Sequence, residues 1–314
     1  ARGVAAAADR YGVIALWTDR VLWVSRDDGR SFHQELAAPE PITAAAVGPD
    51  GRVYAARHGG RLGVLSPDGV TRWLDISADQ LLAIDAGIEM PAPAESPGVA
   101  PTAAPAPAAP WLAVLGLHAD SADGLTPILW LSGDHGRSWR RLIAPHHGDA
   151  SNQIRVGPTG VIDLVTVDGD SSAAAGASGR LRHYTGHVDG RPFALRFASD
   201  EPPPLALGHD GHGWRLEWDG RRMRLIDGSS HLPLAVRNWD VRVAASREHT
   251  YSVADGRLVE LGAGRPRPVT HSVPGAIDAL AVDGLGRALA LVGDTAVRYS
   301  KRHGWRRLFE IPPP

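Results

Sequence analysis

The sequence predicts an all-β fold, a β-propeller of about seven four-stranded blades. Short apolar runs recur along the chain and are separated by turns rich in Gly, Asp, Pro and Asn, which is the pattern of strands. In the C-terminal part these runs come in groups of four, with a period of about 35–40 residues. No window has the 3.6-residue period of an amphipathic helix. At 314 residues, the chain is long enough to form one such repeat domain.

Each group of four runs predicts one blade. The expected blades lie at 3–36, 42–76, 81–143, 152–197, 205–236, 240–271 and 277–310. The first and the last group each look complete. We therefore expect the ring to close by packing between the terminal blades and not by a blade that both ends share.

Two stretches interrupt this repeat. Residues 86–110 are rich in Pro and Ala and contain too little apolar surface to offset the entropy of ordering. Residues 168–179, with the sequence DGDSSAAAGASG, have the composition of a flexible loop. Both stretches lie inside a predicted blade, so we expect 1–314 to be a single domain with an insertion and a long loop.

Two turns share the pattern Ser-x-Asp-x-Gly-x-Ser-aromatic. The defining residues are Ser25, Asp27, Gly29 and Phe32 in the first turn, and Ser132, Asp134, Gly136 and Trp139 in the second. Glycine accepts a positive φ, and the Asp and Ser side chains can accept hydrogen bonds from backbone N–H groups of the turn. This local chemistry predicts a structural role for all eight residues.

With these two turns, the chain resembles the Asp-box (BNR-repeat) β-propeller superfamily. The resemblance implies that the box joins the third and fourth strands of a blade, on the face away from the ligand. Sialidases share the box, but their Arg-Ile-Pro-like segment near the start is absent here. The chain is nearer in style to non-enzymatic members, similar to photosystem-assembly-factor and sortilin-type propellers, which are platforms for protein partners.

The opposite face, formed by the fourth-to-first-strand and second-to-third-strand loops, is therefore the expected binding face. The candidate binding residues on it are His146, His147, Asp149, Arg237 and Trp239. Adjacent histidines in an extended segment point apart, and a zinc site needs three or four convergent ligands, so we expect no metal. No phosphate-binding, dinucleotide-binding or nucleophile-elbow motif occurs, so we expect neither a cofactor nor catalytic residues.

Two other functions stay open at this point. A glycoside hydrolase would need two carboxylates that face each other about 5–10 Å apart, and Asp-rich turns on the expected binding face can supply carboxylates. A glycan-binding lectin would need exposed tryptophans, and the chain contains 10 tryptophans against 4 phenylalanines. Most of these tryptophans fall in predicted strands, where we expect them to fill the space between sheets.

The composition also limits the classes of partner and ligand that the chain can bind. The net charge of −2 gives no general attraction to nucleic acid, and no apolar run is long enough to span a membrane as a helix. The chain has no cysteine, which excludes disulfides and thiolate ligands. The start, Ala1 and a run of mostly small, apolar residues, is what we expect after removal of a signal peptide, and a chain shortened at its N-terminus would look the same. Together with the family resemblance, this predicts a periplasmic or secreted protein that binds a protein partner.

Overall fold

The computed structural model describes residues 2–7, 12–88, 110–120, 124–145, 153–157, 160–168, 180–199, 206–207, 213–218, 223–227, 230–236, 242–246, 249–254, 256–261 and 267–312. The secondary structure assigned to these residues consists of strands, turns and bends. The strands form seven four-stranded sheets, and each sheet is built from four strands that are consecutive in the chain. We call these sheets blades 1 to 7 in chain order.

The strand bounds of the first four blades are as follows. Blade 1 contains β1 (Arg2–Ala6), β2 (Ile14–Thr18), β3 (Val21–Ser25) and β4 (His33–Ala37). Blade 2 contains β5 (Ile42–Val47), β6 (Val53–Arg57), β7 (Arg61–Leu65) and β8 (Thr71–Asp75). Blade 3 contains β9 (Gln80–Ile88), β10 (Pro110–Asp120), β11 (Gly124–Ser132) and β12 (Arg140–Ile143). Blade 4 contains β13 (Gln153–Val156), β14 (Val161–Asp168), β15 (Arg180–His187) and β16 (Ala194–Ser199).

The remaining three blades complete the set. Blade 5 contains β17 (Ala206–Leu207), β18 (Gly213–Trp218), β19 (Met223–Asp227) and β20 (Ser230–Val236). Blade 6 contains β21 (Arg242–Ala245), β22 (Thr250–Ala254), β23 (Arg257–Leu261) and β24 (Arg267–Ser272). Blade 7 contains β25 (Ala279–Val282), β26 (Ala288–Val292), β27 (Thr295–Ser300) and β28 (Gly304–Glu310).

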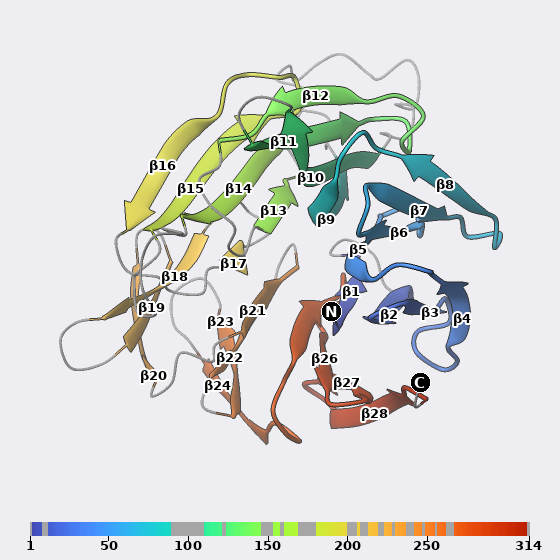
Figure 1. Ribbon diagram of the computed structural model, residues 1–314. Helices are drawn as coiled ribbons and strands as arrows, with labels where there is room; N and C mark the ends of the chain where they lie inside the picture. Colours follow the sequence, from blue (N-terminus) through green and yellow to red (C-terminus); the bar gives the residue numbers. More distant parts are fainter. Residues whose placement is uncertain are drawn as a thin grey trace, which may run out of the picture.

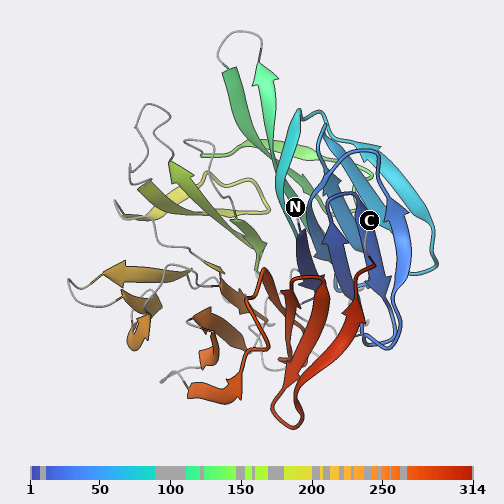
Figure 2. The same ribbon diagram turned by 60° about the horizontal axis from the view of Figure 1, so that its bottom comes forward.

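The seven blades form a ring. The first strand of each blade lies innermost, and these strands contact their neighbours in the order β1, β5, β9, β13, β17, β21, β25 and back to β1. Figure 1 shows this arrangement, with the N-terminus near the centre and the C-terminus at the outer edge beside β4. Figure 2 shows the terminal blades packed against each other from a second direction. Each end of the chain completes its own blade, as the sequence predicts, so no strand is exchanged across the ring closure.

The core lies between neighbouring blades. Alternate side chains of a strand point to opposite faces of its sheet, so each blade can bury one set against the blade before it and another against the blade after it. For example, Ala55 of β6 packs toward blade 1, whereas Tyr54 and Ala56 of the same strand pack toward blade 3. All three side chains are fully buried.

Large aromatic rings fill this space partly by lying over glycines. Gly3 pairs with Trp17 across β1 and β2, and the indole ring leaves no room for a Cβ at Gly3. Gly63 pairs with Trp73 in the same way across β7 and β8, where the ring atoms of Trp73 lie about 3.2 Å from the position of a Cβ. A glycine under an aromatic ring therefore recurs in two blades as a packing device.

The predicted strands agree closely with the observed ones, but the bounds of the insertion differ. The predicted insertion at 86–110 is shorter, because β9 continues to Ile88 and β10 begins at Pro110. The pairing of β9 with β10 extends to Ile88 and Pro110, which explains why these residues belong to the blade. The rest of the insertion, 89–109, lies outside the described residues, as does the predicted loop at 168–179 except for Asp168, which ends β14. In that described part of the chain, no helix is long and apolar enough to cross a membrane.

Candidate functional site

The first box occupies the turn between β3 and β4. The Ser25 hydroxyl donates to the Asp27 carboxylate over 2.8 Å and accepts a hydrogen bond from the Gly29 N–H, also over 2.8 Å. Asp27 in turn accepts hydrogen bonds from the backbone N–H of Arg30 (3.1 Å) and of Ser31 (2.9 Å) and from the Ser31 hydroxyl (2.6 Å). The side chains of the box therefore satisfy the backbone of their own turn.

The second box, between β11 and β12, repeats these contacts. The Gly136 N–H donates to the Ser132 hydroxyl over 2.7 Å, and the Asp134 carboxylate accepts hydrogen bonds from the backbone N–H and the hydroxyl of Ser138. Gly29 and Gly136 both have a positive φ, 77° and 79°, which glycine adopts without a steric cost. Trp139 packs against the core between blades 2 and 3, and Phe32 against that between blades 7 and 1.

The box carboxylates are ionised hydrogen-bond acceptors. The hydroxyl and N–H of Ser31 hold the pKa of Asp27 well below its usual range. Partial burial would raise the pKa of Asp134, but the hydrogen bonds from Ser138 and Ser132 outweigh it and lower this pKa to about 2. An acid with so low a pKa holds no proton near neutral pH, so neither group is suited to act as a general acid.

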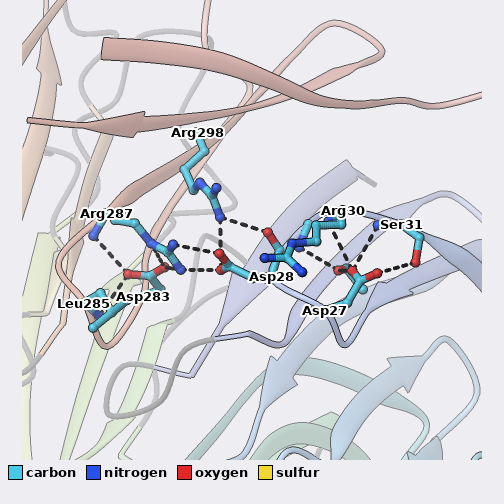
Figure 3. Close-up of polar contacts among 10 residues, drawn as sticks. Asp27, Asp28, Arg30, Ser31, Asp283, Leu285, Arg287 and Arg298 are labelled. Atoms are coloured by element: carbon cyan, nitrogen blue, oxygen red, sulfur yellow. Dashed lines mark hydrogen bonds and ion pairs between the residues drawn. The ribbon is translucent and has the colours of Figure 1, made fainter. Parts of the chain in front are cut away.

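The fourth position of the box makes a contact that the motif itself does not require. Asp28 has a positive φ of 65°, and its side chain reaches blade 7, where Arg287 donates to one carboxylate oxygen over 3.0 Å and Arg298 lies 3.0 Å from the other. Arg287 also donates to Asp283 over 2.7 Å. Figure 3 shows the Asp28 carboxylate between the two guanidinium groups. We call Asp28, Asp283, Arg287 and Arg298 the charge cluster.

The equivalent residue of the second box is His135. It has a φ of 60°, and its Nδ1 lies 3.4 Å from the Asp50 carboxylate and 3.3 Å from the Tyr54 hydroxyl, both in blade 2. Arg72 of β8 donates to the His135 carbonyl over 2.7 Å. Each box thus connects its own blade to the preceding blade. The contact is made with the hairpin between the first and second strands of that preceding blade.

The opposite face is formed by the loops that the sequence assigns to binding. Its described carboxylates tie neighbouring loops together. Asp79, in the β8–β9 loop, accepts a hydrogen bond from the Ala119 N–H over 2.6 Å, and Asp278, before β25, accepts one from the Gly293 N–H over 3.0 Å. Asp294 pairs with Arg2 across the ring closure over 2.9 Å. These contacts connect the described loops of this face to neighbouring strand ends and loops.

Glu40 and Arg57 form the most buried ion pair of this face. Glu40 lies in the β4–β5 loop, and the guanidinium of Arg57, at the end of β6, donates to it over 2.6 Å. The Arg57 side chain is only 3% exposed, whereas that of Glu40 is 48% exposed. The guanidinium also stacks on the Trp73 ring at 4.4 Å. Trp73 is itself 38% exposed, whereas Trp17, Trp23 and Trp130 are buried.

The predicted binding residues fall in stretches of the chain that the structure does not describe. His146, His147, Asp149, Arg237 and Trp239 all lie outside the described residues. Among the residues that are described, no group of three or more His, Asp or Glu side chains is arranged to hold a metal ion.

Sequence reasoning also missed the charge cluster. The sequence does contain a pattern that could have indicated it. Two hairpins of similar sequence end in Gly-Arg, at Gly51-Arg52 and at Gly286-Arg287. In the structure, Arg52 lies near His135 and Arg287 contacts Asp28, so each arginine lies beside a box residue of the next blade.

The arrangement agrees with solved structures. The chain is similar to the β-propeller domain of the trilobed protease from Pyrococcus furiosus, with a TM-score of 0.59 and 12% identity over 96% of this chain and 95% of that chain. The fold is a β-propeller. The prediction of an all-β propeller with four-stranded blades is therefore confirmed. The solved propeller is described as having an open velcro topology, and at this level of identity the likeness concerns the fold alone.

A second solved structure, of a putative oxidoreductase (glucose dehydrogenase) from Thermus thermophilus, matches with a TM-score of 0.43 and 16% identity over 81% of this chain and 91% of that chain. No protein-family profile matches the chain, and no curated protein sequence does.

Proposed function

We propose that the chain is a non-catalytic binding propeller that holds a protein partner, or a larger complex, outside the cytoplasm. The observation that supports it is the cross-linking of loops on the face opposite the Asp boxes. There, Asp79, Asp278, Asp294 and Glu40 each connect one loop or strand end to another. A surface whose loops are already ordered loses little conformational entropy on binding, which favours recognition of a partner.

The same contacts indicate that these carboxylates stabilise the loops of this face. The Glu40 carboxylate faces a guanidinium, and Asp79 and Asp278 face backbone N–H groups. Glycoside hydrolysis uses two carboxyl groups on either side of the scissile bond, one of them with a raised pKa. The described acids of this face have partners of another kind, so binding is favoured over hydrolysis.

The location outside the cytoplasm is supported by the two boxes, through their resemblance to Asp-box propellers, and cell fractionation with an antibody against the native protein tests it. Recovery of the native protein only in the cytoplasmic fraction would contradict this part of the proposal.

Affinity capture from the native source tests the binding itself. The wild-type chain should recover a partner. The variant His146→Ala/His147→Ala/Asp149→Ala and the variant Arg237→Ala/Trp239→Ala should each recover less of it. Arg30→Ala and Arg137→Ala are the matched controls, because both are exposed residues at the sixth position of an Asp box on the other face. Loss of the partner in the controls but not in the other variants would contradict the proposal.

Glycan binding is the second candidate, and Trp73 is the observation that favours it. An exposed indole ring can stack on a sugar, and the ring of Trp73 is more exposed than those of the buried tryptophans. Binding of the chain to an immobilised glycan array, compared with that of Trp73→Ala, separates the two candidates. A glycan signal that disappears in this variant would favour the lectin.

A further inference from the structure

Blades 1 and 7 meet where the ring closes, and we call the interface between them the seam. Neighbouring blades elsewhere in the ring follow each other along the chain, as blade 1 does through the β4–β5 connection. Blades 1 and 7 are built from the two ends of the chain and share no strand. Among the described residues, no strand pairing crosses the seam, where the two terminal blades lie side by side (Figures 1 and 2).

Part of this closure is apolar. Leu16 of β2 and Leu289 of β26 belong to one buried cluster. Phe32, the aromatic residue of the first Asp box, stacks on Phe309 of β28 with ring centroids 4.8 Å apart. Such contacts resemble those between other neighbouring blades, so they do not by themselves distinguish the seam.

The charge cluster adds charged contacts across the seam. Asp28 is the member that blade 1 contributes, and Asp283, Arg287 and Arg298 come from blade 7. Arg298 binds both the carboxylate and the carbonyl of Asp28, at 3.0 and 2.9 Å. The side chains of Arg287 and Arg298 are only 16% and 17% exposed. Without the Asp28 carboxylate, Arg287 would keep Asp283 as its ionic partner, whereas Arg298 would lose the carboxylate that it contacts and keep the hydrogen bond to the carbonyl of residue 28.

We infer that the ring opens along the seam as a unit, and that Asp28 controls how often it does so. Opening there breaks no strand pair and no chain connection, whereas separating any other two neighbouring blades strains the segment that joins them. Local opening follows the line of lowest free energy, and a line that no chain segment crosses can open without straining such a segment. The positive φ of Asp28 places its carboxylate across this line.

Thiol labelling tests the inference without background, because the chain has no cysteine. Ala296→Cys introduces a thiol at a position that is 2% exposed in the seam, and Ala56→Cys introduces one at a position that is 0% exposed between blades 2 and 3. With a thiol reagent in excess, the labelling rate of each probe reports how often its interface opens. The Ala296→Cys probe should be labelled faster than the Ala56→Cys probe.

Asp28→Asn should then raise the labelling rate of the Ala296→Cys probe about tenfold or more, and leave that of the Ala56→Cys probe unchanged. Asparagine tolerates the left-handed backbone of this position, so the substitution removes mainly the charge. Arg26→Gln is the matched control, since Arg26 makes a half-buried ion pair with Glu35 and bonds to Gly51 and Ser66 at the joint between blades 1 and 2. It should leave labelling at the seam unchanged.

Two results would overturn the inference. One is an equal increase at both probes on Asp28→Asn, which would mean general unfolding. The other is an unchanged rate at the Ala296→Cys probe. If Asp28→Asn fails to fold, the labelling rate of the Ala296→Cys probe is measured at increasing salt concentration in the chain that keeps Asp28. Salt screens the partly exposed charge cluster and so weakens it. A labelling rate at Ala296→Cys that does not rise with salt relative to Ala56→Cys would then overturn the inference.

Discussion

Asp28 and His135 occupy the same position in two turns of one sequence pattern, and both have left-handed backbones, with φ values of 65° and 60°. Each side chain reaches the first hairpin of the preceding blade, where Asp28 meets Arg287 and His135 meets Asp50. The glycine, serine and aspartate of the box shape the turn, so the residue between Asp and Gly is left free to point at the neighbouring blade. In this chain, each of these two turns therefore both closes a hairpin and joins two blades.

Protonation of His135 should weaken the joint between blades 2 and 3. Partial burial and the nearby Arg52 lower the pKa of His135. The unfolded chain then takes up the proton at a higher pH than the folded chain does. The contribution of neutral His135 to stability is fully present above about pH 6.5, the ordinary value, and is lost as the pH falls toward the folded-state pKa. Urea unfolding across this pH range measures the decrease in unfolding free energy.

His135→Asn is the control for this prediction, because asparagine accepts the left-handed backbone and does not titrate. The difference in unfolding free energy between the two proteins isolates His135 from the other histidines. An equally steep loss of stability with falling pH in His135→Asn would contradict the prediction.

Ser132→Ala should destabilise the chain by about 1–2 kcal/mol, since it leaves the buried N–H of Gly136 without its acceptor. Ser138→Ala, in the same box, should cost about 0.5 kcal/mol or less, because Ser138 is exposed and its backbone N–H still reaches Asp134. Chemical denaturation of the two variants measures the contrast. Equal costs would show that the box is not organised around the buried serine.

Glu40→Gln should destabilise the chain by about 1–2 kcal/mol, because the buried guanidinium of Arg57 loses its ionic partner. The value is set below that of a fully buried pair, since about half of the Glu40 side chain is exposed. The control is Asp75→Asn, which removes the exposed pair with Arg61 and should cost about 0.5 kcal/mol or less. Thermal or urea unfolding compares the two, and a larger effect of Asp75→Asn would contradict the assignment.

The sequence alone predicts the parts of this structure that depend on local chemistry. The turn hydrogen bonds of Asp27 involve residues within four positions, so the motif is enough to anticipate them. The strand ranges follow from alternation and turn residues for the same reason. Trp139 shows the limit of this accuracy, because the apolar run after the second box predicts a strand over 138–143, whereas β12 begins at Arg140.

Contacts between distant segments lie beyond such reasoning. Asp28 and Arg287 are 259 positions apart, and only closure of the ring brings them together. Trp73 is one of the tryptophans that fall in predicted strands and are expected to fill the space between sheets, and its ring does cover Gly63 and Arg57. It remains partly exposed because β8 is the outermost strand of its blade, a position that alternation does not reveal.

Hydrogen exchange on the captured complex tests the central claim, that a partner binds the face opposite the Asp boxes. Amides in the loops at 38–41, 76–79 and 293–294 should exchange more slowly in the complex than in the free chain. Those in the box turns at 26–32 and 133–139 should be unchanged. Protection of the box turns, with unchanged exchange in the loops of the opposite face, would contradict the claim.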